Sequence, residues 1–494
     1  MTSRAEPSIW HYFGFLLFSI AFLILSDLSV TWLVLLTCSL VFGAICFWFK
    51  NIKLILFLGF VFCSSIHLTK ALIVEGGIYT PGLSLSISDV FLIPLTFIWL
   101  AEKKFFLKQK IYWSKLHLPP LLFLLWLWFS ALVAEDHFAG ILMCISYTKY
   151  FLIFTLLSDF ISSPQYLRYA LFAFALGMCA HFTLAFLEVG LGRGIAIQGA
   201  KTTTLGTRLV FEQAGGVHAF RPSGFAGHPN ALANILVFTL PTFLILVILG
   251  RRFLGFESHF LVTGIFAVGI VVLILTLSRG AWISFTCSLI YMFYIGYKRG
   301  IIPKRHIQAI LTCALIGGLA TVAIFPTALL RITESDQRSG ESRIVMMKQA
   351  ALIIQRNPIF GVGIAGYNGA ARTNIPESFS RLSPWFQDEL LKGVVHNKYL
   401  LVMSETGIVG FALFVLMLYR FLIVVPKGDF WTNPLFFSLA LGFTAGVFGQ
   451  AVFYMVDHFY ADPRITMLYL FFGFIGSIVK LQKEENEVLQ RVSA

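Results

Sequence analysis

One histidine in the sequence has the surroundings of a group that handles protons. His396 stands in Val395-His396-Asn397-Lys398-Tyr399, where a long polar segment meets an apolar run. A neutral imidazole at such a boundary could accept a proton near pH 7. The alternative is a structural histidine that hydrogen-bonds a backbone carbonyl, and these residues alone leave both interpretations open.

Two arginines have the positions of groups that hold an anion. Arg221 precedes Gly227-His228-Pro229-Asn230, where Pro229 suits the first turn of a helix, and we expect the free amides of that turn to favour a nearby anion. Arg279 lies between two apolar runs, where a guanidinium costs about 2–3 kcal/mol unless it reaches the membrane surface or finds a partner. A lone arginine there is typical of an interfacial anchor. Two guanidiniums on one face, by contrast, suit a diphosphate.

The elements that must position these residues are membrane helices. Of the 494 residues, 58% are hydrophobic and 12% are charged, against about half and about a quarter in soluble domains. The fold class is therefore an all-α polytopic membrane protein with about fourteen transmembrane helices, twelve being the lower bound. The expected helices are 10–25, 28–49, 52–69, 84–100, 118–134, 141–157, 166–187, 230–249, 259–276, 281–297, 307–325, 399–424, 434–455 and 464–480.

The distribution of Lys and Arg predicts the orientation of the chain. With the N-terminus inside, the inside segments carry twenty basic residues, whereas the short outside loops carry only Lys70, Arg279 and Arg464. This asymmetry follows the positive-inside rule, so we expect an even number of helices and two cytoplasmic termini. The same rule accounts for most of the net charge of +13, which leaves no reason to invoke nucleic acid as a partner.

The expected organisation alternates helical blocks with two long outer segments. In the second outer segment, apolar residues at helical spacing predict a short amphipathic helix from Arg343 to Arg356, with a Ser start, that stops before Asn357-Pro358. The divisions are 1–187 (N-terminal transmembrane helices), 188–229 (outer segment), 230–325 (central transmembrane helices), 326–398 (large outer loop) and 399–494 (C-terminal transmembrane helices and cytoplasmic tail).

Cofactor and metal chemistry receive little support from the sequence. Gly361-x-Gly363-x-x-Gly366 has the spacing of a dinucleotide fingerprint but lacks the preceding strand and following helix, so its glycines are expected to permit a close turn. The acidic groups that could hold a metal show no ligand spacing. We therefore expect no cofactor and no metal. These groups are Glu135-Asp136-His137, Asp388-Glu389 and Asp457-His458.

Together these residues resemble a known family. His396-Asn397, followed after nine residues by Gly407-x-x-Gly410, is similar to the motif of bacterial O-antigen ligases and the related O-antigen and exopolysaccharide polymerases. The segments around Arg221 and Arg279 resemble the two arginine segments of that superfamily, and Arg343 to Gly363 resembles its pre-histidine loop. The similarity covers about 215–425.

The resemblance implies a metal-independent membrane glycosyltransferase with a bundle of the GT-C kind. Such enzymes take a glycan from undecaprenyl diphosphate on the periplasmic face of the bacterial inner membrane and transfer it to an acceptor hydroxyl, in O-antigen, lipopolysaccharide or exopolysaccharide assembly. Arg221 and Arg279 would then grip the diphosphate, and His396 would activate the acceptor hydroxyl. Arg343, Asn397 and Asn230 are expected to contact substrate. Partners would be the lipid-linked donor, a glycan or lipid acceptor, the bilayer and other polysaccharide assembly proteins.

The acceptor and a second class of function stay open at this stage. Fourteen helices and a 72-residue outer loop from Pro326 to Asn397 exceed the compact twelve-helix ligase pattern, which favours a polymerase over a ligase that uses lipid A-core. A flippase for lipid-linked oligosaccharides, or another transporter, is the alternative from a different class. Transporters place polar groups near the midplane of the membrane, whereas Lys149 is the main charge within the expected helices here.

Overall fold

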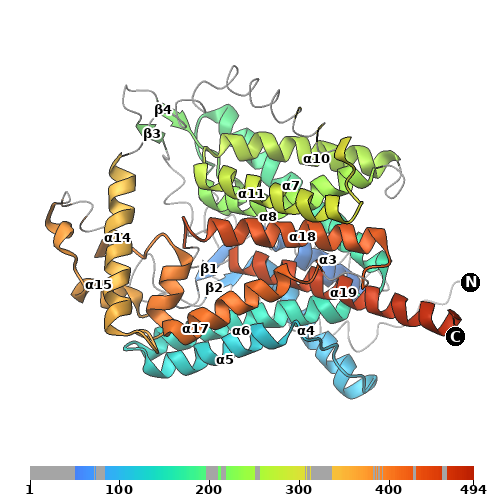
Figure 1. The fold of residues 1–494 in the computed structure, drawn as a ribbon, viewed down its shortest axis with the longest axis horizontal. Helices are drawn as coiled ribbons and strands as arrows, with labels where there is room; N and C mark the ends of the chain where they lie inside the picture. The colour runs from blue at the N-terminus through green and yellow to red at the C-terminus, as the bar shows by residue number, and fades with distance from the viewer. Residues whose placement is uncertain are drawn as a thin grey trace, which may run out of the picture.

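The computed structural model shows a bundle of long helices with shorter elements gathered at one end (Figure 1). It describes residues 51–71, 73, 84–195, 210–212, 218–250, 256–305, 308, 312, 337–381, 384, 387, 390–391, 393–426, 430–458 and 464–493. The expected helices 10–25 and 28–49 lie outside these residues, and so does 307–325 apart from positions 308 and 312.

The other expected helices are all present, and most of their ends lie within about four residues of those predicted. The exceptions are the expected helix 52–69, which ends at Cys63, and the expected helix 464–480, which continues to Ser493. The corresponding helices are α3 (Ile52–Cys63), α4 (Ile87–Ala101), α5 (Leu118–Val133), α6 (His137–Phe160), α7 (Pro164–Leu191), α8 (Pro229–Leu249), α10 (Phe256–Leu275), α11 (Arg279–Lys298), α17 (Lys398–Leu422), α18 (Pro434–Phe453) and α19 (Arg464–Ser493). Within the described residues, seven of them are long and apolar enough to cross a membrane, namely α6, α7, α8, α10, α17, α18 and α19. The fold is thus that of an all-α polytopic membrane protein.

Helix α8 lies inside the bundle and α10 lies at its edge. In the apolar span of α8, 83% of the residues are buried inside the protein, against 22% in that of α10. Helix α18 runs antiparallel to α8 at very short range, because a Cβ at Gly446 would overlap the carbonyl of Phe238. Glycines of this kind let two membrane helices pack backbone to backbone. Elements fixed to the ends of α8 and α18 are therefore held in place by a rigid core.

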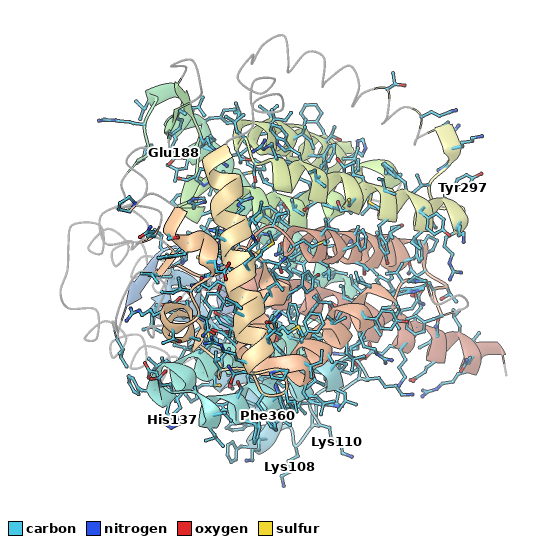
Figure 2. The ribbon with its side chains drawn as sticks, turned by 60° about the vertical axis from the view of Figure 1, so that its left-hand side comes forward. Lys108, Lys110, His137, Glu188, Tyr297 and Phe360 are labelled. Carbon is cyan, nitrogen blue, oxygen red and sulfur yellow. The ribbon has the colours of Figure 1, made fainter. Side chains whose placement is uncertain are left out.

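Short elements collect at the end of the bundle that carries the expected outer segments. They are the strand pairs β1–β2 (Thr69–Ala71 with Ser84–Ser86) and β3–β4 (Val210–Glu212 with His218–Phe220), a 3-10 turn (Gly224–Ala226), α14 (Gln337–Arg356), α15 (Tyr367–Thr373) and a second 3-10 turn (Glu377–Arg381). Figure 1 shows α14 standing across this end of the helices. Figure 2 places Glu188, near the end of α7, and Tyr297, near the end of α11, at opposite ends of the bundle. A π-helical turn (Glu102–Phe106) continues α4 away from the end that carries these short elements.

The helix predicted from Arg343 to Arg356 is longer at its start than expected. It begins at Gln337, so Ser339 and Gly340 lie within it instead of preceding it. Gly costs a helix about 1 kcal/mol and Ser less, and packing of the later turns against α15 and α17 offsets such a loss. The predicted end before Asn357 is confirmed.

The charge expected within the membrane helices has a partner. The ammonium of Lys149 in α6 lies 3.3 Å from a carboxylate oxygen of Asp89 in α4. The same carboxylate accepts the backbone N–H of Ser86 in a capping box at the start of α4. This pair joins two helices and neutralises both charges.

Candidate functional site

The site end of the bundle is built around a break in α17. At Gly407 the backbone takes φ 65° and ψ −171°, so α17 consists of two helical pieces on either side of this residue. The loop that follows α14 fills the break with hydrogen bonds to backbone groups of α17. Val362 and Gly363 donate their N–H groups to the carbonyls of Ser404 and Glu405 at 3.0 and 2.9 Å, and Ile408 donates to the carbonyl of Pro358 at 2.9 Å.

Three glycines make this contact between loop and helix possible. A Cβ at Gly407 would overlap the carbonyl of Ile359, and a Cβ at Gly361 or Gly363 would overlap backbone atoms of Glu405 or Ala134. All three have positive φ, of 65°, 71° and 90° respectively, which L-residues with side chains rarely adopt. Gly361 and Gly363 therefore permit a close turn against the backbone of other segments, as predicted from the sequence.

His396 lies just before α17, beside the carboxylate of Asp457, which follows the C-terminal end of α18. Its Nδ1 is 3.7 Å from Oδ1 of Asp457, which is longer than a hydrogen bond but within ion-pair range. The ring of His458 lies 4.9 Å from that of His396. Burial alone would raise the pKa of the Asp457 carboxyl, but His396 beside it and the charges of His458 and Arg464 hold that pKa far below its ordinary value. Asp457 is thus ionised at neutral pH.

The segment that carries Asp457 is tied to the start of α17 by backbone contacts. Asn397 caps α17, because its Oδ1 accepts the N–H of Leu400 at 3.0 Å, and its Nδ2 donates to the carbonyl of Met455 at 3.0 Å. The N–H of Lys398 donates to the carbonyl of Tyr454 at 2.8 Å. These bonds fix the distance between His396 and Asp457.

Arg221 joins the loop before α8 to the end of α10. Its Nε donates to the carbonyl of Thr276 at 2.6 Å, and one of its terminal nitrogens donates to Oδ1 of Asn230 at 2.8 Å. The side chain is 6% exposed. Thr276 is three residues before Arg279, so the two arginine segments meet, as the sequence predicted. Arg221 itself is a fixed charge within the fold instead of an extended arm.

A buried carboxylate of α7 holds the loop that carries Arg221. Glu188, which is 2% exposed, accepts the N–H of Ser223 at 2.7 Å, the hydroxyl of Ser223 at 3.0 Å and the N–H of Gly224 at 2.8 Å. Three hydrogen bonds to one buried carboxylate leave the loop little freedom to move.

Arg279 is the first residue of α11 and lies beside the same segment as Asp457. The adjacent Gly280 is packed so closely that a Cβ on it would stand 2.7 Å from the side chain of Val456. Arg279 is half-buried and makes no hydrogen bond or ion pair within the part of the chain that the structure describes.

The pKa of His228 depends on charged residues from several parts of the site. Burial lowers the pKa of its imidazole, Asp457 acts in the opposite direction, and the positive charges of Arg464, Arg221 and His396 lower the pKa as well, so that it lies at about 4. Four charged or titratable residues from separate parts of the sequence thus influence one ring. The structure brings Arg221, Arg279 and His396 to one end of the bundle and adds Asp457, His458, Arg464 and His228 to them.

The amides at the start of α8 differ from the prediction. His228 caps the helix with its side chain, and Nδ1 accepts the N–H of Asn230 at 3.1 Å. The carbonyl of His228 accepts the N–H groups of Ala231 and Leu232 at 2.9 and 3.0 Å, and Pro229 has no N–H. The expectation of free amides for an anion is therefore wrong, because the capping residue already uses them.

The residues expected to contact substrate are placed in different ways. Both amide atoms of Asn397 and the side-chain oxygen of Asn230 are engaged within the chain. Arg343 lies in the first half of α14, without a hydrogen bond or ion pair to any described residue. Contact of these three with substrate stays a prediction.

The group of His396, Asp457 and His458 could also bind a cation. Each side chain offers one ligand atom, and these atoms lie within 4.8 Å of one another in the described part of the chain. The positive charge of Arg464, which acts on the same carboxylate, would repel such a cation. Sequence spacing does not reveal this group, because its third member, His396, belongs to a different segment from Asp457 and His458.

Comparison with known proteins identifies part of the chain. Residues 264–415 match the family model described as O-antigen ligase. No curated protein matches the chain significantly. The matched region contains Arg279, Arg343, His396 and Gly407, whereas Arg221 and Asp457 lie on either side of it. The match supports the resemblance seen in the sequence: residues 264–415 are similar to the O-antigen ligase family.

Proposed function

We propose that this protein transfers a glycan from undecaprenyl diphosphate to an acceptor hydroxyl, without a metal, on the periplasmic face of the bacterial inner membrane. The observation that carries the proposal is the meeting of His396, its carboxylate partner Asp457 and two arginine segments at one end of the bundle. Proton acceptance and anion stabilisation are the two tasks that this transfer requires. Both termini then lie in the cytoplasm.

His396 acts as the base in this proposal. Asp457 lies next to Nδ1 of the imidazole, so it favours the tautomer with the proton on Nδ1 and leaves the Nε2 lone pair for the acceptor hydroxyl. As the hydroxyl oxygen attacks the sugar carbon, its proton passes to Nε2, and the ionised Asp457 stabilises the imidazolium that forms. A positioned base of this kind contributes roughly 10²- to 10⁴-fold in rate.

The arginines stabilise the leaving diphosphate. Arg279 is half-buried and unpaired among the described residues, so its forked N–H groups can reach two phosphate oxygens. Arg221 adds a positive charge from a fixed place, because Thr276 and Asn230 hold it. Preorganised charge of this kind supplies much of the barrier reduction in group transfer, since it does not have to reorient during the reaction.

The acceptor that we favour is a second lipid-linked glycan, which makes the protein a polymerase. The long outer loop that contains α14 and α15 covers the site end, and it supplies surface for a growing polysaccharide. A ligase that transfers the finished chain to lipid A-core is the alternative. Deletion of the gene separates the two: a polymerase mutant accumulates single lipid-linked repeats, whereas a ligase mutant accumulates finished lipid-linked chains.

The reaction itself is tested with purified protein and a lipid-linked donor. His396→Ala and Arg279→Ala should each abolish transfer while the protein stays folded in detergent. Arg279→Lys should also be impaired, because lysine keeps the charge and loses the fork. Full activity of His396→Ala would overturn the assignment of the base.

Metal independence needs a separate experiment, because His396, Asp457 and His458 could together bind a cation. A chelator should leave the rate unchanged, and added Zn²⁺ should inhibit by occupying the base. Loss of activity in chelator that Zn²⁺ or Mg²⁺ restores would show instead that the three side chains hold a catalytic metal.

A further inference from the structure

The capping residue of α8 has an unusual side chain for its position. Helices are usually capped by Ser, Thr, Asp or Asn, but His228 fills this place with φ −149° and ψ 137° and accepts the N–H of Asn230 through Nδ1. A serine oxygen could accept the same bond. The imidazole therefore brings something that the cap does not need.

What it brings is a second nitrogen whose protonation is determined by the first. Because Nδ1 accepts a hydrogen bond, the proton of the neutral ring must sit on Nε2. This Nε2 makes no hydrogen bond to any described residue and is not among the enclosed polar atoms. His228 thus presents a fixed N–H donor to the space at the start of α8.

The ring keeps this state at neutral pH. Burial lowers the pKa of His228, Asp457 acts in the opposite direction, and the charges of Arg464, Arg221 and His396 lower the pKa as well, so that it lies at about 4. The positive end of the α8 dipole acts in the same direction. His228 is consequently neutral from about pH 5 upwards. It serves as a hydrogen-bond donor and cannot exchange roles with His396.

Asn230 contacts both His228 and the guanidinium of Arg221. Asn230 donates its backbone N–H to Nδ1 of His228 and accepts a hydrogen bond from Arg221 through Oδ1. The N–H groups at the start of α8 are all in use. The donor that a helix start commonly offers to an anion is therefore missing from the backbone here, and the imidazole N–H of His228 can replace it.

We propose that Nε2–H of His228 donates a hydrogen bond to a phosphate oxygen of the polyprenyl diphosphate, as a binding residue beside Arg221. The inference rests on the proposed function, because that function places a diphosphate at this end of the bundle. It adds a neutral donor to the two arginines, and it gives Asn230 the task of positioning both groups.

A matched pair of variants isolates the donor from the cap. His228→Ser keeps an oxygen that can accept the N–H of Asn230 and removes the distal N–H. The control is His259→Ser in α10, whose ring contacts the carbonyl of Val247 at the opposite end of α8. Both variants should keep the melting temperature of the wild type within a few degrees.

The probe is undecaprenyl diphosphate without a glycan, titrated into detergent-solubilised protein and followed by native mass spectrometry. His228→Ser should weaken binding about 10- to 100-fold, because it removes a hydrogen bond to a charged group. His228→Asp keeps the cap but adds a negative charge, so it should bind still more weakly. His259→Ser should bind as the wild type does. The pH dependence of binding between pH 6 and 8 should be the same in His228→Ser and wild type.

Each outcome supports or overturns the inference. Equal binding by His228→Ser and wild type would overturn it, as would a wild type that does not bind the diphosphate. Parallel transfer assays separate it from the proposed function: if His228→Ser loses diphosphate binding but the wild type transfers no glycan, the binding role stands and the proposed function fails. If His396→Ala loses transfer while His228→Ser binds normally, the proposed function stands and this inference fails.

Discussion

The break in α17 makes a sharp prediction for Gly407. In Gly407→Ala the new Cβ would overlap the carbonyl of Ile359, and the backbone φ of 65° is one that alanine adopts only at a cost of about 1–2 kcal/mol. The overlap also forces the 358–363 loop away from α17, where three hydrogen bonds join them. Each such bond contributes about 0.5–1.5 kcal/mol. We expect a loss of about 3–6 kcal/mol in the free energy of unfolding.

Thermal unfolding of the purified protein in detergent measures this effect. The matched control is Gly264→Ala in α10, because a Cβ at Gly264 meets no atom within 4 Å and its φ is ordinary. Gly264→Ala should be neutral or slightly stabilising, whereas Gly407→Ala should melt several degrees lower. It should also expose the 358–363 loop to protease. Equal melting temperatures for the two variants would refute the role of Gly407 as the point that admits the loop.

Three further predictions follow from buried groups. Glu188→Ala should destabilise by about 3 kcal/mol or more, because it leaves the donors of Ser223 and Gly224 unsatisfied; Glu188→Gln should cost far less, and similar melting temperatures for the two would contradict this. Asp457→Asn should lower kcat of transfer by roughly 10²-fold while KM for the donor changes little, and an unchanged kcat would remove Asp457 from the mechanism. Burial lowers the pKa of His117 to about 4, so the unfolded state binds its proton first and stability falls as pH drops from about 6.5 towards 4. The loss at pH 5 should be about 2 kcal/mol, and a melting temperature of His117→Asn with the same pH dependence as wild type would refute it.

The membrane helices could be predicted from the sequence because lipid imposes a simple rule. A backbone that crosses hydrocarbon must satisfy its hydrogen bonds within a helix, so apolar runs of the right length mark helix positions directly. α8 begins at Pro229 and α17 at Lys398, each one residue before the predicted start. The same rule does not apply to the outer segments, where Gln337 begins α14 well before the predicted Arg343.

The meeting of the two arginine segments could be predicted as well, but the surroundings of His396 could not. Orientation of the helices placed Arg221 and Arg279 on one face, and the Arg221–Thr276 hydrogen bond joins their segments. In the sequence, Asp457 stands out only as one half of the pair Asp457-His458. Asp457 approaches His396 because α17 and α18 form a helical hairpin, which brings the start of α17 and the end of α18 to the same end of the bundle. Hydropathy alone predicts the order of such helices along the chain, but it does not predict which helices pack against each other.

The cap of α8 shows a different limit of sequence reasoning. Pro229 correctly indicated the first turn, and a general rule then assigned free amides to that turn. The rule failed because a histidine can cap a helix with its side chain and carbonyl together. A residue outside the usual capping set at such a position is itself a signal that its other atoms have a use.

The bonds between residues 397–398 and 454–455 have a consequence for how this chain can be recombined. His396 lies inside the region that the family model matches and Asp457 lies beyond its end, so the matched region is not a portable unit. A chimera with a relative joined between α17 and α18 would pair the histidine of one parent with the carboxylate segment of the other. Junctions before residue 395 or after residue 458 keep the pair together.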